Sequence, residues 1–132
     1  SQRSKLYRFS DKKWCDLGFG LASVLAHRRT GRVRFAFRHD RTARIVAQHR
    51  IIAHASLCVL RPNAGSDDCW AWSAPEAGGV QRLAVKFVDP RWAAEFRAAF
   101  DAAKQPPDEE LLALHARLFV FAQGAWLAAG RG

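Results

Sequence analysis

The segment from 32 to 49 alternates between apolar and basic residues, and this alternation limits the fold more than any other feature of the chain. Val33, Phe35 and Phe37 occupy every second position, with polar or small residues between them. A period of two is that of a half-buried β-strand, with one face in the core and one in solvent. The run HDRT at 39–42 then offers a turn before a second alternating run, ARIVAQH. We therefore expect a β-hairpin over 32–49 with a basic outer face.

Short runs of the same kind recur along the first two thirds of the chain, separated by turn residues such as TGR, NAGS and PEAGG. In the last of these runs, Leu83, Val85 and Phe87 should face the core. Six or seven short strands at close spacing are typical of a small antiparallel barrel or sandwich. Besides the hairpin, the patterns predict strands at 5–9, 17–27, 51–60, 69–73 and 82–88.

The apolar period changes to that of a helix after residue 88. Asp89 is a suitable N-cap, Pro90 suits the first helical position, and aromatic residues follow at every fourth position from Trp92. This pattern predicts one amphipathic helix, ending at Lys104, that closes an end of the barrel. QPPDEE then breaks that helix and offers acidic residues for the start of another. We therefore expect a domain at 1–104 and an appended helical tail at 105–132.

The net charge of +9 is concentrated in the first part of the chain. Residues 1–50 contain 13 Lys or Arg against three Asp, whereas residues 51–132 contain eight basic and nine acidic residues. Such asymmetry indicates an acidic partner: nucleic acid, an anionic membrane surface or an acidic protein segment.

The sequence shows no pattern for catalysis or for a metal site. The three cysteines lack paired spacing, and the five histidines are not spaced as zinc ligands. Asp67 and Asp68 are adjacent in a turn rather than paired across a cleft. There is neither a signal-like N-terminus nor an apolar run of membrane-spanning length. We expect a binding protein that is not an enzyme, in the cytoplasm, with shuttling through the nucleus as an open alternative.

The motifs of this chain follow one another in the order of a known family. They are KLYRF, Trp14 with Gly18 and Gly20, the basic hairpin, LRPNAGSDDCWAW, LAVKF and AAEFRAAF. In this order and spacing the chain resembles the Ran-binding domain family over about residues 4–104. The resemblance implies a mainly β, pleckstrin-homology-like fold, a seven-stranded antiparallel barrel capped by a C-terminal α-helix.

The resemblance also implies a function. Ran-binding domains bind the GTP form of the small GTPase Ran and hold its acidic C-terminal tail, which a basic surface would suit. They assist hydrolysis stimulated by the Ran GTPase-activating protein and the release of nuclear transport receptors. GTP and Mg²⁺ would be bound by Ran, so this chain would need no cofactor. The candidate partner-binding residues are Arg32, Arg34, Arg38, Arg41, Arg44, Arg61, Asn63, Ser66, Asp67, Trp70 and Lys86.

Several alternatives stay open at the level of sequence. A pleckstrin-homology-like module for phosphoinositide headgroups would also use a basic surface. Binding to nucleic acid is not expected, because the aromatic RNA-recognition strand motif is missing. Trp14, Trp70 and Trp72 suit either the core or an interface. In the tail, the apolar spacing fits a nuclear export signal as well as a packing helix, through Leu111, Leu114, Leu118 and Val120.

Overall fold

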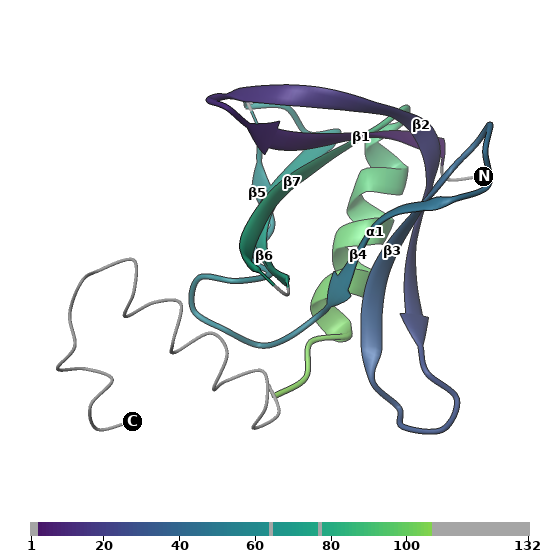
Figure 1. Cartoon of the computed structure of the whole chain (residues 1–132), viewed down its shortest axis with the longest axis vertical. Helices are drawn as coiled ribbons and strands as arrows, with labels where there is room; N and C mark the ends of the chain where they lie inside the picture. The colour runs from purple at the N-terminus through teal and green to yellow at the C-terminus, as the bar shows by residue number, and fades with distance from the viewer. Residues whose placement is uncertain (1–2, 64, 77, 107–132) are drawn as a thin grey trace, which may run out of the picture.

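The computed structural model describes residues 3–63, 65–76 and 78–106 and shows a curled antiparallel sheet wrapped around one helix (Figure 1). The sheet has seven strands in the order β4-β3-β2-β1-β7-β6-β5. The predicted fold class, an antiparallel seven-stranded sheet closed by a C-terminal helix, is confirmed. The elements are β1 (Arg3–Ser10), β2 (Lys13–Ala26), β3 (Val33–His39), β4 (Ile45–Arg50), β5 (Arg61–Pro62), β6 (Cys69–Glu76), β7 (Gly79–Phe87) and α1 (Pro90–Ala102).

The predicted hairpin corresponds to β3 and β4, which pair in antiparallel register. Phe35 and Phe37 are fully buried, whereas Arg34 and Arg38, which flank this pair, are exposed. Leu83, Val85 and Phe87 of β7 are buried in the same core cluster. Alternation therefore assigned the two faces of these strands correctly.

The helix α1 fills the space between the two ends of the curled sheet (Figure 1). Asp89 caps its N-terminus by accepting a hydrogen bond from the backbone N–H of Arg91 at 2.8 Å. Phe96 and Phe100 are buried among the aromatic side chains of the core, and burying each contributes about 2 kcal/mol. The helix ends at Ala102, two residues before the predicted end.

Two glycines in β2 fit this strand closely between its neighbours. Leu17 has no partner in β1, because Leu6 pairs with Gly18 and Tyr7 with Asp16, and Gly18 takes a φ of +98° at this bulge. At Gly20 an added Cβ would lie 2.1 Å from the carbonyl oxygen of Arg38, which leaves no room for a side chain. These contacts fix where the hairpin lies against β2.

The strand predicted at 51–60 is not present. Only the isolated bridge between Ile52 and Gln105 forms there, and β5 is limited to two residues. The Nδ1 of His54 accepts hydrogen bonds from the backbone N–H groups of Ser56 and Leu57, which turns the chain out of an extended path. The larger apolar side chains of 51–60, such as Ile51, Ile52 and Leu57, are nevertheless buried, so the segment is a loop that covers the core. A short apolar run in the sequence does not distinguish such a loop from a strand.

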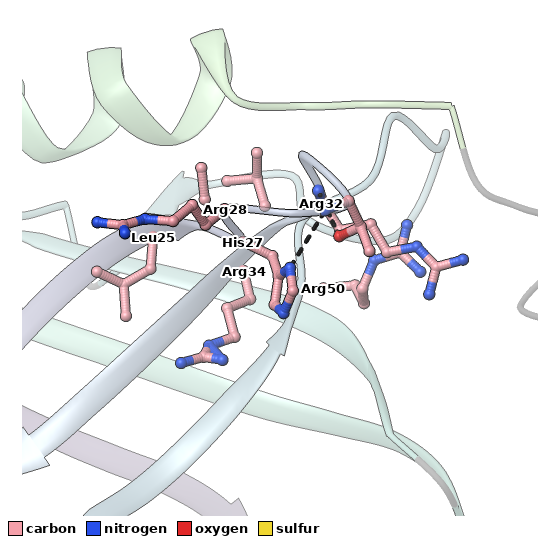
Figure 2. Close-up of a pocket in the computed structure, with 9 residues that line it drawn as sticks. Leu25, His27, Arg28, Arg32, Arg34 and Arg50 are labelled. Atoms are coloured by element: carbon pink, nitrogen blue, oxygen red, sulfur yellow. Dashed lines mark hydrogen bonds between the residues drawn. The ribbon is translucent and has the colours of Figure 1, made fainter.

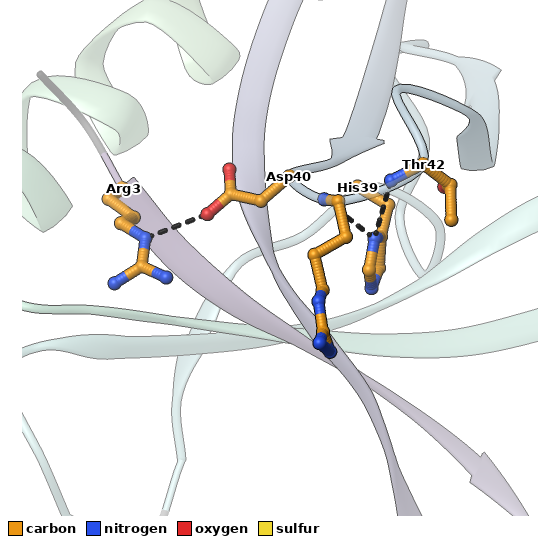
Figure 3. Close-up of polar contacts among 5 residues, drawn as sticks. Arg3, His39, Asp40 and Thr42 are labelled. Atoms are coloured by element: carbon orange, nitrogen blue, oxygen red, sulfur yellow. Dashed lines mark hydrogen bonds and ion pairs between the residues drawn. The ribbon is translucent and has the colours of Figure 1, made fainter.

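The turns at the two ends of β3 share one sequence, His-x-Arg-Thr-x-Arg, at 27–32 and 39–44. In each turn the histidine Nδ1 accepts hydrogen bonds from the backbone N–H groups two and three residues later. The donors are Arg29 and Thr30 in the first turn, and Arg41 and Thr42 in the second. In each, the threonine hydroxyl also accepts from the final arginine's N–H. Figure 3 shows the second turn, where Asp40 also pairs with Arg3. Two identical turns therefore frame β3.

The fifth position of these turns is left-handed in both copies, with Gly31 at φ +73° and Ala43 at φ +60°. A non-glycine residue costs about 1 to 2 kcal/mol in this region, and glycine's extra freedom in the unfolded chain offsets part of that. We expect Ala43→Gly to raise the free energy of unfolding by about 0.5 to 1 kcal/mol in urea titrations. Gly31→Ala, where an added Cβ meets no neighbour, should lower it by a similar amount. Destabilisation by Ala43→Gly would contradict this explanation.

Candidate partner-binding surface

The end of β2, the following turn and the adjoining ends of β3 and β4 form a basic hollow of about 640 Å³, here called the arginine pocket (Figure 2). Arg34 faces Arg50 in the β3–β4 register and Leu25 in the β2–β3 register, so all three lie on the outer face of the sheet. Arg28 and Arg32 come from the turn. The pocket is lined by Leu25, Ala26, His27, Arg28, Thr30, Arg32, Val33, Arg34 and Arg50.

Four arginines gathered at one end of a sheet create a positive potential that attracts anions. Each guanidinium offers a planar fork of N–H donors, which matches a carboxylate or a phosphate in two parallel hydrogen bonds. Arg28, Arg32 and Arg34 are exposed to water, which screens their mutual repulsion in the unbound protein. The arrangement is therefore suited to an anionic ligand.

The other predicted hairpin arginines lie at the opposite end of β3. Arg38 donates from its Nη1 to the carbonyl oxygen of Ala43 at 2.7 Å, and Arg41 and Arg44 belong to the exposed β3–β4 turn. Arg34 and Arg38 share the outer face and are about 13 Å apart along the strand, given about 3.3 Å per residue. The five arginines therefore form two groups along one strand, an extended strip that suits an extended ligand better than a compact one.

A second candidate surface lies on the other side of β1, where Tyr7, Trp14, Asn63, Ser66, Cys69 and Lys86 line a hollow of about 260 Å³, the aromatic pocket. The turn that supplies Asn63 and Ser66 is held by local hydrogen bonds. Ser66 donates from its N–H to the carbonyl oxygen of Asn63 at 3.1 Å, and its hydroxyl donates to Asp68. Arg61 and Asp67 are exposed beside it.

Lys86, predicted in one set with the hairpin arginines, lies instead beside the turn that supplies Asn63 and Ser66. It lies opposite Lys5 in β1 and opposite Cys69 in β6. The sheet order puts β1 and β2 between it and β3, so the curled sheet separates the two groups. The predicted site residues therefore fall on two surfaces.

The three tryptophans considered for an interface have different positions. Trp70 is only 7% exposed, and its Nε1 donates to the carbonyl oxygen of Ala93 at 2.8 Å. Trp70 is thus a core residue that holds α1 on the sheet, which corrects its assignment to the partner surface. Trp72 is also in the core, whereas Trp14 packs, partly buried, on the outer face against Cys69 and its neighbours.

Sequence interpretation missed two arginines of the arginine pocket, Arg28 and Arg50. Arg50 lies on the same side of β4 as Gln48, and the alternating run ARIVAQH extends to it by one position. Pairing the two strands in register would have placed it opposite Arg34. Arg28 is in a turn, where no periodic pattern indicates the direction of a side chain.

Other chemistry is not indicated by the described residues. All three cysteines are free thiols, and burial raises the pKa of Cys58 and of Cys69, which disfavours a reactive thiolate. Within residues 3–63, 65–76 and 78–106, no group of three potential ligands comes together for a metal ion. The helix in this part of the chain is not long and apolar enough to cross a membrane.

Residues 1–106 match the family model of the RanBP1 domain. The chain belongs to this family. It is 34% identical over 108 residues to the human E3 SUMO-protein ligase RanBP2, a match that covers 77% of this chain and 3% of that protein. It is 32% identical over 111 residues to the human RanBP2-like and GRIP domain-containing protein 4, covering 80% of this chain and 6% of the relative. This RanBP1 domain therefore spans a small part of the curated relatives it matches.

The fold of this RanBP1 domain is similar to that of a solved Ran-binding domain. The crystal structure of the domain from the nuclear pore complex component Nup2 of Ashbya gossypii superposes with a TM-score of 0.63 at 16% identity, over 77% of this chain and 91% of that chain. At this identity the likeness concerns the fold, and it confirms the predicted pleckstrin-homology-like architecture. The family model extends to residue 106, two residues beyond the predicted domain boundary.

Proposed function

We propose that this RanBP1 domain binds the GTP form of Ran and holds Ran's acidic C-terminal tail on the arginines of β3 and its two turns. The observation that carries the proposal is the strip formed by the arginine pocket, Arg34 and Arg38 along one exposed strand. An extended acidic segment would meet cations at intervals along this strip, and clustered charge accelerates the encounter of opposite charges. Membership of the RanBP1 domain family supports Ran as the partner.

The aromatic pocket is a second contact area in this proposal, for the body of the GTPase. Its turn is fixed by its own hydrogen bonds, and Trp14 and Tyr7 offer amphipathic rings of the kind enriched at interfaces. The two surfaces lie on different parts of the curled sheet, so the tail and the body would contact the domain separately. The tail would be available only when it is detached from the GTPase body, which would make binding depend on the bound nucleotide.

Further steps of the proposal follow from holding the tail away from the GTPase. The domain would assist hydrolysis stimulated by the Ran GTPase-activating protein and the release of transport receptors, while the catalytic groups belong to those partners. It would act as a binding module and not as an enzyme, with no cofactor of its own. The proposal includes a cytoplasmic location, with shuttling through the nucleus as the alternative.

Isothermal titration with Ran in its two nucleotide states tests the proposal. We expect binding to Ran loaded with a non-hydrolysable GTP analogue to be tighter by at least about two orders of magnitude than binding to Ran-GDP, a difference of about 2.7 kcal/mol. Titration of Ran loaded with the GTP analogue into buffer without the domain serves as the baseline. Equal affinity for the two nucleotide states would contradict the proposal.

A phosphoinositide headgroup is a second candidate ligand, because the arginine pocket is large enough for one and is lined by four arginines. Flotation with liposomes that contain or lack phosphoinositide distinguishes the two functions. Under the main proposal the domain stays in the soluble fraction with both. Flotation that depends on phosphoinositide and is lost in Arg34→Glu would favour the headgroup.

A further inference from the structure

We propose that the chain's own acidic segment, Asp108-Glu109-Glu110, occupies the arginine pocket and competes there with acidic segments of other proteins. The intramolecular contact stands independently of the proposed function. Only the statement that the competitor is Ran's tail rests on it. The pocket is then a regulated site, in which the internal segment lowers the apparent affinity for an external acidic ligand.

Gln105 attaches the end of the domain directly to the wall of the pocket. Its Oε1 accepts a hydrogen bond from the N–H of Val33 at 3.0 Å, and its Nε2 donates to the carbonyl oxygen of Gly31 at 3.0 Å. Its backbone carbonyl also accepts from the N–H of Ala53 at 2.8 Å. Three hydrogen bonds therefore hold this residue between the β2–β3 turn and the 51–60 loop.

The position of this anchor determines where the chain continues. Gln105 bonds to the residues on either side of Arg32, and both Arg32 and Val33 line the arginine pocket. Asp108 follows three residues later, so its Cα lies within about 10 Å of the Gln105 Cα, given at most about 3.3 to 3.6 Å per residue. Carboxylate and guanidinium side chains add several ångströms of reach. An acidic segment at this distance along the chain is therefore within reach of the pocket.

The charges of segment and pocket are complementary. Three consecutive acidic residues follow the anchor, and four arginines, Arg28, Arg32, Arg34 and Arg50, line the hollow beside it. A ligand on a short tether has an effective concentration in the millimolar range. A carboxylate contact that is weak between separate molecules is then substantially populated. By occupying the pocket it lowers the affinity of the pocket for an external anion, and the external anion weakens the internal contact by the same factor.

Heteronuclear NMR of the full chain tests the contact without any partner. We compare the wild type with a variant whose segment is neutral, Asp108→Asn/Glu109→Gln/Glu110→Gln. The backbone amide resonances of 31–34 and Arg50 should differ between them. The charge-matched control Asp11→Asn/Asp67→Asn/Glu76→Gln removes three negative charges far from the Gln105 anchor and should leave these resonances at their wild-type positions. Unchanged pocket resonances in the neutral-segment variant would overturn the proposal.

Binding of a fluorescein-labelled hexaglutamate peptide, followed by anisotropy, tests the competition. We expect the neutral-segment variant to bind this peptide at least about five-fold more tightly than the charge-matched control, the lower end of the usual coupling range. Equal affinities of these two variants would overturn the proposal, because the gain would then be an effect of net charge. Neither measurement uses Ran, so failure here is distinguishable from failure of the proposed function.

A second copy of the chain is the competing occupant. Isotope-labelled neutral-segment variant is mixed with unlabelled wild type, whose acidic segment can enter the labelled pocket only from another molecule. We expect the labelled pocket resonances to stay unchanged at concentrations well below the millimolar effective concentration of the tether. Shifts that develop in this mixture at low concentration would assign the contact to dimers and contradict an intramolecular site.

Discussion

Reversing Arg28 and Arg34 to glutamate is expected to slow the association of the domain with GTP-loaded Ran by about ten- to a hundred-fold at low salt. Both side chains line the arginine pocket, where the acidic tail of Ran is proposed to arrive. Electrostatic steering changes association rates by this order, and charges at the site have more influence than those elsewhere. Stopped-flow fluorescence gives the rate constant directly. The dissociation rate should change less than the association rate.

The control for this prediction is Arg91→Glu/Arg97→Glu on α1, away from the arginine pocket and the aromatic pocket. It makes the same change in net charge at two exposed residues outside the arginine pocket. The ratio between the two variants should shrink as salt is raised, because ions screen exposed charges beyond about 8 to 10 Å at physiological strength. If the two variants slow association equally, net charge and not the strip along β3 determines the rate.

Acidification from pH 6.5 to 4 is expected to remove about 3 kcal/mol of stability through His49 alone. The Trp72 indole can only donate, so its 2.9 Å hydrogen bond to His49 Nε2 requires that this nitrogen be an acceptor. The proton of the neutral ring is then on Nδ1, which donates to the carbonyl oxygen of Arg50 at 2.7 Å. Protonation of Nε2 would bring two donors together inside the core.

The sign of the pH effect follows from this geometry. Burial lowers the pKa of His49 to about 4, whereas the histidine of the unfolded chain titrates near 6.5. Between these values the unfolded state binds the additional proton, so the contribution is complete above pH 6.5 and is lost as the pH falls towards 4. Urea unfolding at several pH values measures it. His49→Gln should flatten the dependence, whereas the exposed His27→Asn should retain most of it. An equally steep loss in His49→Gln would assign it to other groups.

The sequence predicted those parts of the fold that depend on local chemistry. The face of each residue in β3 and β7 follows from a period of two, and the start of α1 follows from Asp89 and Pro90. The loop at 51–60 was mistaken for a strand, because its buried apolar residues resemble those of a strand and the turn at His54 uses an imidazole in place of the usual turn residues. Histidine is not among the residues that usually indicate a turn, so the sequence pattern did not predict this one.

The candidate site was predicted in composition but not in arrangement. The basic hairpin was correctly expected on an exposed face, yet its arginines divide between the two ends of β3, and Arg50 joins them only through the β3–β4 register. Lys86 and Trp70 were assigned to the surface set from motif membership alone. Sheet order separates Lys86 from the hairpin, and the packing of α1 buries Trp70. Both outcomes depend on long-range pairing, which a local pattern does not contain.

The tail from 107 to 132 lies outside the described residues, so the choice between a nuclear export signal and a packing helix stays a prediction. Among the described residues just before this region, Gln105 is held by hydrogen bonds to Val33 and Gly31. The proposed contact of the acidic segment with the arginine pocket concerns its first residues and is compatible with either role for the leucines that follow.

The most direct test of the tail-capture model is the association rate of the domain with GTP-loaded Ran, compared between intact Ran and Ran lacking its acidic C-terminal tail. Stopped-flow measurements at low and at high salt give four rate constants. We predict that removing the tail slows association strongly at low salt and removes most of the salt dependence, as expected when the tail supplies the opposing charge. Equal rates and equal salt dependence for intact and truncated Ran would show that the arginines of β3 do not bind the tail.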